Sequence, residues 1–323
     1  MQHLFLILSL AFSSTLQAKQ YDINIKAESK SNFGTCVLPA RITIPDKAKA
    51  VVIIIHGSGP HDFDGTAPGG YTIYKDIAES LERQGIAAVR YTKRSAIKNC
   101  AEKINHPDFT HDVFIDDMRS IIRLVKIHST LKSLPIFLLG HSQGVSFATV
   151  VAKDDVRIKG LVLMAGLGRF PISTTLVRQL KAALETPGLT KNQMFHIRAN
   201  YRKAKRFFKK LKQRKIKKEK FFMGAYRDFW IEQEKLTYNT AKIASQVRVP
   251  SLVIQGAADA NVTKADFQTL VKATKKIKGS SNEYYPRVNH LFTEGNSKRV
   301  SATVMSRIGK WILSQIRIPD SKK

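Results

Sequence analysis

The sequence predicts an α/β protein: a doubly wound, mostly parallel sheet with a basic helical cap inserted between two of its strands. Three observations predict it. Short β-branched apolar runs alternate with amphipathic stretches, one long stretch contains no strand pattern, and that stretch holds a dense run of Lys and Arg. Strands that are apolar on both faces belong inside a parallel sheet covered by helices, so these runs predict a buried central sheet.

Five apolar runs are expected to form the central strands, at 51–55, 86–91, 135–140, 160–164 and 250–255. Helical periodicity is expected over 71–84, 112–128, 144–153 and 297–316. Short alternating stretches in 21–45 predict antiparallel strands at the sheet edge, and a short strand is expected near 283–285.

The amino terminus predicts export. Leu4–Phe12 is a largely apolar run, well below the roughly 20 residues of a membrane span, and small residues follow it up to Ala18. We expect residues 1–18 to be a signal peptide and the protein to be secreted or periplasmic; a short uncleaved hydrophobic anchor is the alternative. The remaining chain divides into a first core part, 19–167, a helical cap, 168–246, and a second core part, 247–323.

The chain has two cysteines, Cys36 and Cys100. An even number of cysteines in an exported protein permits a disulfide, and two buried thiols are the alternative. Neither cysteine has the spacing of a metal site or a redox pair.

The net charge of +29 is concentrated in the cap, where residues 198–220 hold 13 Lys or Arg and one acidic residue. Apolar residues interleave at roughly helical spacing: Phe207, Phe208, Leu211 and Ile216. The pattern predicts an amphipathic helix with a solvated basic face. The alternative is a surface that docks on an anionic membrane or another polyanion. Nucleic acid is not expected, because no recognised nucleic-acid module is visible.

The strongest chemical signal is Gly140-His141-Ser142-Gln143-Gly144, which follows the apolar run 135–139 and opens a helical stretch. A serine on a tight strand-to-helix turn projects its Oγ from the carboxyl end of the sheet, and the crowded turn requires Gly on both flanks. The following helix places N–H groups beside a developing oxyanion. We therefore expect Ser142 to be a nucleophile; a chance Gly-rich turn is the alternative.

A nucleophilic serine needs a base and an orienting carboxylate. In hydrolases built around such a turn, the acid and then the His follow the Ser along the chain. Asp259 follows the run 250–255, and His290 lies on the last loop before the final helix, so we expect them to complete the triad. The rejected competitors are His106 and His111, which precede the Ser, His196 in the cap, and Asp266 inside the next helix.

The oxyanion hole needs two N–H donors, for which we expect the backbone of Gln143 and of Ser58, with Gly59 as second choice. Ser58 lies on the loop 56–60, beneath which His56 is expected to be structural.

No metal or nucleotide motif appears at the required spacing, so no cofactor and no metal are expected. A nearby polar cluster is interpreted as a loop at the site mouth rather than a metal site: His61, Asp62 and Asp64.

At these residues the sequence resembles bacterial esterases of the α/β-hydrolase superfamily, related to dienelactone hydrolases and acyl-CoA thioesterases. The resemblance is carried by 56–60, 85–94, 140–144, Gln255-Gly256 with Asp259, and 289–292. It implies an α/β-hydrolase fold, the triad Ser142, Asp259 and His290, and a structural loop formed by Lys93 and Arg94. The sequence departs from these relatives at Thr92, where they usually carry Asp. It departs from them again at Gln143 and Val145, and these two differences leave the acyl-group preference undetermined by the resemblance.

We therefore expect a serine hydrolase that cleaves small-molecule carboxylic esters through an acyl-enzyme. The alternatives are a peptidase or acyl-peptide hydrolase on the same core, and a non-catalytic module that docks on anionic membranes through the cap. Phe229 and Trp230 are expected to pack the cap on the core, with the lining of an acyl pocket as the alternative. The natural substrate, the acyl-chain preference and the oligomeric state stay open.

Overall fold

An eight-stranded sheet forms the centre of the computed structural model, which describes residues 19–29 and 33–316. The strand order is β1-β2-β6-β3-β7-β8-β9-β10, and the strands from β6 to β10 are parallel. The bounds are β1 Lys19–Ala27, β2 Cys36–Ile44, β3 Ala50–Ile55, β6 Ile86–Tyr91, β7 Ile136–His141, β8 Ile158–Met164, β9 Ser251–Gly256 and β10 Ser281–Tyr285. The predicted antiparallel edge is formed by β1 and β2.

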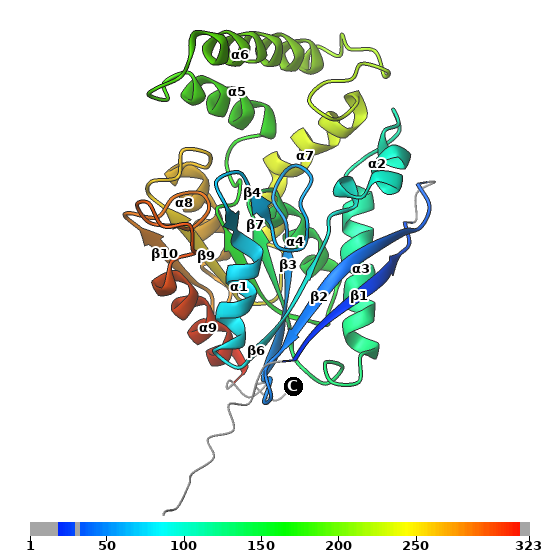
Figure 1. The fold of residues 1–323 in the computed structure, drawn as a ribbon, viewed down its shortest axis with the longest axis vertical. Coiled ribbons are helices and arrows are strands. Elements are labelled where there is room, and N and C mark those ends of the chain that lie inside the picture. Colours follow the sequence, from blue (N-terminus) through cyan, green and yellow to red (C-terminus); the bar gives the residue numbers. More distant parts are fainter. Residues whose placement is uncertain (1–18, 30–32, 317–323) are drawn as a thin grey trace, which may run out of the picture.

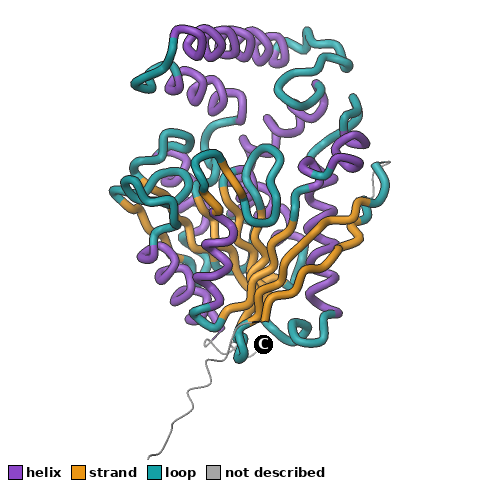
Figure 2. Tube along the Cα trace, in the orientation of Figure 1, coloured by secondary structure: helices purple, strands orange, loops and turns teal. Residues whose placement is uncertain are grey.

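Helices cover both faces of the sheet, as Figures 1 and 2 show. On one face α1 (Ile73–Glu82) and α9 (Ala302–Ile316) pack together. On the other lie α3 (Asp112–Ile127), α4 (Gln143–Asp154) and α8 (Lys264–Thr274). The central strands β3, β6 and β7 are buried along their whole length, which is why their sequences are apolar on both faces. The predicted doubly wound α/β architecture is confirmed.

Three helices lie between β8 and β9: the first two lie above the carboxyl ends of the strands, and the third runs down from them and packs against α4 (Figure 1). They are α5 (Ile172–Ala183), α6 (Lys191–Lys212) and α7 (Arg227–Ala244). Apolar side chains of α5, α6 and the start of α7 form a separate cluster that includes Phe207, Phe208 and Trp230, whereas Leu236 and Ala244 in the second half of α7 belong to the core cluster. This segment, the cap, is tied to the core at its start, because the buried carboxylate of Asp266 accepts hydrogen bonds from the N–H groups of residues 168–170.

The basic segment is helical over less of its length than its periodicity predicts. Helix α6 ends at Lys212, and Arg214 adopts a left-handed conformation with φ of 57°. The N–H of Lys215 reaches back to the carbonyl of Lys210 at 2.9 Å, a bond that closes the helix end. Ile216 therefore lies beyond the helix, yet it remains buried in the cap cluster. No sequence signal predicts this helix end, because the residue that usually marks such an end is Gly and here it is Arg214.

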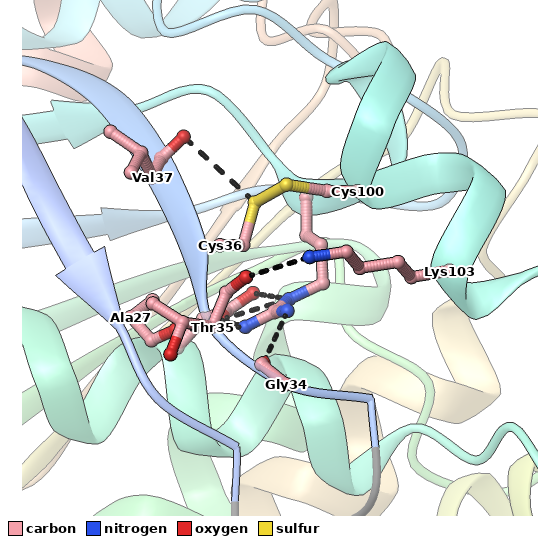
Figure 3. The surroundings of a disulfide bond; sticks show 9 residues. Ala27, Gly34, Thr35, Cys36, Val37, Cys100 and Lys103 are labelled. Carbon is pink, nitrogen blue, oxygen red and sulfur yellow. Dashed lines mark hydrogen bonds and ion pairs between the residues drawn. A yellow bond between two sulfur atoms is a disulfide. The ribbon is translucent and has the colours of Figure 1, made fainter.

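Cys36 on β2 and Cys100 on α2 (Lys98–Ile104) form a disulfide, with their Cα atoms 5.8 Å apart. Figure 3 shows the bond beside the carbonyl of Thr35, which accepts a hydrogen bond from Lys103. The alternative of two free thiols is therefore wrong.

The predicted signal peptide, 1–18, lies outside the described residues. Within the described part of the chain, no helix is both long and apolar enough to cross a bilayer.

Candidate active site

Ser142 lies at the junction of β7 and α4, where the chain turns sharply. Its φ of 55° and ψ of −118° are strained for a residue with a side chain. The two flanking glycines allow this turn. A Cβ on Gly140 would lie 2.5 Å from the carbonyl oxygen of Gly144, and a Cβ on Gly144 would lie 2.4 Å from that of Ile55. The Gly-x-Ser-x-Gly pattern therefore has a steric cause in this fold.

His290 and Asp259 are in direct contact. The ring nitrogen Nδ1 of His290 lies 2.8 Å from Oδ2 of Asp259, and a carboxylate only accepts, so Nδ1 carries the proton. Three further donors hold Asp259: the N–H groups of Asn261 and Val262, at 2.7 and 2.9 Å, and Nε2 of Gln255, at 2.8 Å. Burial raises the pKa of Asp259, but the bond from His290 and the backbone N–H groups lower it further, and the net pKa is lowered. The carboxylate is thus ionised near neutral pH and orients the imidazole.

Ser142 and His290 line one cavity of about 220 Å³. Within the described residues, no hydrogen bond joins Oγ of Ser142 to the His290 ring; such bonds often tighten only when substrate is bound. His141 supports His290 from below, because its Nε2 lies 2.9 Å from the His290 carbonyl oxygen. Burial lowers the pKa of His141 to about 3, so this ring stays neutral and serves as a support.

The loop after β3 approaches the serine closely. The N–H of Gly57 donates to the hydroxyl of Tyr74 at 2.9 Å, and the carbonyl of Ser58 lies 2.8 Å from Nε2 of His61. Within the described residues, the N–H of Ser58 makes no hydrogen bond to the protein. Ser58 and Gln143 both line the cavity that holds Ser142. The two predicted oxyanion donors are therefore on residues that border the same space as the nucleophile.

A second cavity, of about 530 Å³, lies between the core and the cap. It shares Ser58, Gln143, Ile172 and Leu176 with the first cavity, and its remaining lining is mostly apolar. The aromatic and aliphatic residues of this lining are Ile104, Phe109, Phe114, Ile172, Leu176, Met223, Ala225, Phe229 and Trp230. Phe229 packs the cap on the core, as predicted, because its ring stacks on the ring of Phe109 with centroids 5.4 Å apart. Trp230 packs edge-on against Phe208 inside the cap cluster.

The other polar residues singled out by the sequence lie as follows. His56 is buried beneath the loop, between the rings of Tyr74 and Tyr91, as a structural residue would be. Asp62 accepts the N–H of Thr66 and Asp64 pairs with Arg90, so this cluster is a polar loop. Among residues 19–29 and 33–316, no group of three or more His, Cys, Asp or Glu side chains could hold a metal ion.

Several residues at the site were not identified from the sequence as site residues. Tyr74, His141 and Gln255 hold the loop, the base and the acid, and Gln233 on α7 reaches Gln143 from the cap. Two of them had a sequence signal: His141 stands inside the Gly-rich turn, and Gln255 is among the residues that carry the family resemblance. Lys93, expected in a structural loop near the site, donates hydrogen bonds to the carbonyl oxygen of Gly57 and to Oε1 of Gln143.

Comparison with known proteins identifies the family of this chain. A family model described as serine aminopeptidase, S33, matches residues 46–295. Esterase EstD of Thermotoga maritima is 28% identical over 284 residues, covering 86% of this chain but 64% of that protein, so the chain spans under two thirds of that relative's length. A monoglyceride lipase homolog of monkeypox virus is 26% identical and covers 85% of this chain and 92% of that protein.

Among solved structures, a thermostable carboxyl esterase from Bacillus coagulans superposes with a TM-score of 0.64 at 15% identity, covering 92% of this chain and 99% of the other. A likeness at this identity shows the shared fold. The predicted α/β-hydrolase fold and the resemblance to its esterase branch are confirmed. Because the family model matches residues 46–295, well over half of the chain, the chain belongs to the serine aminopeptidase S33 family of α/β-hydrolases.

Proposed function

We propose that this protein is a carboxylesterase that forms an acyl-enzyme on Ser142. The observation that carries the proposal is the hydrogen-bonded pair of Asp259 and His290 in the same cavity as a serine held on a strained turn at a helix N-terminus. An imidazole whose Nδ1 proton is held by a buried carboxylate presents Nε2 as a base. The relatives named as esterases support ester substrates.

The chemistry follows from these positions. Oγ of Ser142 attacks the ester carbonyl carbon, and Nε2 of His290 takes the hydroxyl proton. The carbonyl oxygen becomes an oxyanion that accepts hydrogen bonds from the N–H groups of Gln143 and Ser58. The C–O bond to the alcohol then breaks, and the imidazolium protonates the leaving alkoxide. Water attacks the acyl-enzyme with His290 again as base, which releases the carboxylic acid and restores the serine.

The two cavities support a proposal for where the alcohol and acyl halves of the ester bind. His290 must protonate the leaving oxygen, so the alcohol leaves on the side of the 220 Å³ cavity that His290 lines. The acyl group then extends past Ser58 and Gln143 into the 530 Å³ apolar cavity beneath the cap. The proposed substrates are therefore esters of a small alcohol with a bulky apolar acyl group.

Ala225→Phe is expected to shorten the acyl preference, because Ala225 is buried and lines the larger cavity. Against a series of p-nitrophenyl esters, kcat/KM for octanoate should fall by about 10-fold or more, while acetate changes by less than about twofold. The matched control is Ala302→Phe on the exposed start of α9, which should leave the whole series unchanged. Equal losses for acetate and octanoate would place the acyl group elsewhere.

The proposal is tested by treating the purified protein with a fluorophosphonate probe and locating the label by mass spectrometry. Label on Ser142, lost in His290→Ala, is expected, because the probe reacts with an activated serine. Failure to label the folded protein would refute the esterase and favour a non-catalytic module. Matched p-nitrophenyl ester and p-nitroanilide substrates then separate the esterase from the peptidase alternative: faster cleavage of the anilide would support a peptidase.

We further propose that the protein works outside the cytoplasm. Two observations support this: the apolar run at Leu4–Phe12 has the length of a signal peptide core, and the Cys36–Cys100 disulfide suits an oxidising compartment.

We also propose that the protein docks on anionic membranes through the basic residues 198–220 of the cap. Of the 13 Lys and Arg side chains in 198–220, only Lys218 forms an ion pair within the described residues, with Asp108. The other twelve are exposed, while the apolar side of α6 faces the cap cluster. Phe195 is 68% exposed near the start of the same helix and offers an apolar anchor. Cations near an anionic bilayer each contribute about 1 kcal/mol of binding free energy.

Vesicles with 30% phosphatidylserine are expected to bind the protein, and neutral phosphatidylcholine vesicles are not. Reversal of four charges on α6 should weaken binding by at least about 100-fold: Lys203→Glu, Lys205→Glu, Lys209→Glu and Lys210→Glu. The control reverses four exposed lysines elsewhere: Lys47, Lys276, Lys278 and Lys310. Equal losses in both variants would show that net charge, and not this surface, governs binding.

A further inference from the structure

Lys93 is a buried lysine that the mechanism above does not use. It follows β6, its side chain is 4% exposed, and it lines the larger cavity beside Ser58 and Gln143. Its Nζ donates to the carbonyl oxygen of Gly57 at 2.7 Å. A second bond, at 3.2 Å, reaches Oε1 of Gln143. Removing an ammonium group from water is costly, so a buried lysine usually has hydrogen-bond partners that compensate for the lost hydration.

The first bond acts on the peptide that carries an oxyanion donor. The carbonyl of Gly57 and the N–H of Ser58 belong to one peptide unit, and no cis peptide occurs among the described residues. In a trans peptide these two groups point in opposite directions. Holding the Gly57 oxygen on one side therefore fixes the direction of the Ser58 N–H on the other. The preceding peptide unit is held as well, because the N–H of Gly57 donates to the Tyr74 hydroxyl at 2.9 Å. Both peptide units that flank the Gly57 Cα are therefore held by hydrogen bonds.

The second bond acts on the residue that carries the other donor. The side-chain amide of Gln143 accepts from Lys93 and donates to Oε1 of Gln233 at 2.8 Å. Gln233 lies on α7 and is fully buried. This chain of hydrogen bonds ties the first residue of α4, whose N–H faces the developing charge, to both the oxyanion loop and the cap.

We propose that Lys93 is a positioning residue of the oxyanion hole, an inference that rests on the proposed esterase function. Its ammonium orients the Gly57–Ser58 peptide and anchors the Gln143 side chain. Both N–H donors are thereby preorganised, and a positive charge lies beside the space where the oxyanion forms. Preorganised donors and charges in a water-poor site account for much of enzymatic rate acceleration.

The charge of Lys93 responds to pH near neutrality. Burial lowers its pKa to about 7, and the carboxylate of Asp117 opposes that decrease. Two other titratable groups face Lys93, His56 and His61, and burial lowers the pKa of both. Asp117 faces it as well. Burial raises the pKa of Asp117 to about 6, although the nearby charge of Arg94 acts to lower it. Of these four residues, Lys93 is therefore the one that loses its positive charge as the pH rises through about 7.

The test is Lys93→Met, which keeps the length of the side chain and removes its charge and donors. For p-nitrophenyl acetate, kcat is expected to fall about 10- to 100-fold while KM changes by less than about twofold, since a lost oxyanion donor costs 10²–10³ and a misoriented one costs less. The rate of fluorophosphonate labelling should fall in parallel. The decline of wild-type kcat above pH about 7 should be absent from the variant. Tm should stay within about 4 °C, because an apolar group replaces a buried charge.

The matched control is Lys98→Met, an exposed lysine on the same segment, which should behave as wild type. A Lys93→Met variant with wild-type kcat and pH profile would overturn the inference. So would a fall in kcat matched by a large fall in Tm and a rise in KM, which would indicate a structural role. A wild-type protein without turnover or label would instead refute the esterase proposal itself.

Discussion

Ser142→Ala should lower kcat/KM for a p-nitrophenyl ester by at least about 10⁴-fold, because the step that forms the acyl-enzyme has no other nucleophile. The fold should persist, since Ala and Ser have the same strain at φ of 55° and the flanking glycines are unchanged. Steady-state kinetics with urea unfolding in parallel measure both quantities. The free energy of unfolding is expected to stay within about 1 kcal/mol of wild type.

The partner residues provide the control. His290→Ala should lose nearly as much activity as Ser142→Ala, and the double variant should lose no more than either single one, because the two residues act as a unit. Asp259→Asn should keep the geometry but hold His290 in the wrong tautomer, again with a loss of several orders of magnitude. Turnover at the wild-type rate in Ser142→Ala would exclude the serine mechanism. Additive losses in the double variant would show that the two residues do not cooperate.

Arg94→Met should lower the free energy of unfolding by about 3–5 kcal/mol, the largest stability effect expected of a single side chain here. Arg94 is fully buried, and its guanidinium contacts Asp117 through three hydrogen bonds of 2.5 to 3.1 Å. It also donates to the carbonyl of Gly34 at 3.2 Å, next to the disulfide shown in Figure 3. The substitution leaves the Asp117 carboxylate buried without its countercharge, which is the costly outcome.

Two comparisons separate this effect from a general loss of packing. The double variant Arg94→Met/Asp117→Leu should recover much of the stability, because no lone charge remains. Arg157→Met breaks an ion pair with Asp155 on a side chain that is 37% exposed, and it should cost about 1 kcal/mol or less. A loss in the double variant as large as that in Arg94→Met would show that the cost comes from packing.

The pH dependence of this loss has a definite sign. Burial raises the pKa of Asp117 to about 6 in spite of Arg94, above its ordinary value of 3.8, so the folded protein binds this proton more tightly than the unfolded chain. A raised carboxyl pKa favours the folded state at low pH and loses that contribution as the pH rises through the folded pKa. Without Arg94 the pKa rises further. Urea unfolding of Arg94→Met should therefore show a larger deficit at pH 7 than at pH 5.

The sequence by itself determined the local features of this protein. The short apolar runs predicted β3, β6 and β7 because a strand buried on both faces has few polar positions. The Gly140–Gly144 pattern identified the turn, since only glycine tolerates the 2.5 and 2.4 Å approaches that a Cβ would meet there. Chain order then singled out Asp259 and His290, which the structure places 2.8 Å apart. Each of these features depends on neighbours in the chain or on the order of elements.

Only the tertiary structure decided the features that depend on residues far apart in the chain. Lys93 reaches Gly57 across 36 positions and Gln143 reaches Gln233 across 90, and no periodicity encodes such pairs. The sharing of Ser58 and Gln143 by two cavities, and the end of α6 at Lys212, were likewise not visible in the sequence. The physical reason is that burial and hydrogen bonding are set by what the fold brings together, whereas a sequence pattern reports the periodicity and backbone needs of one segment.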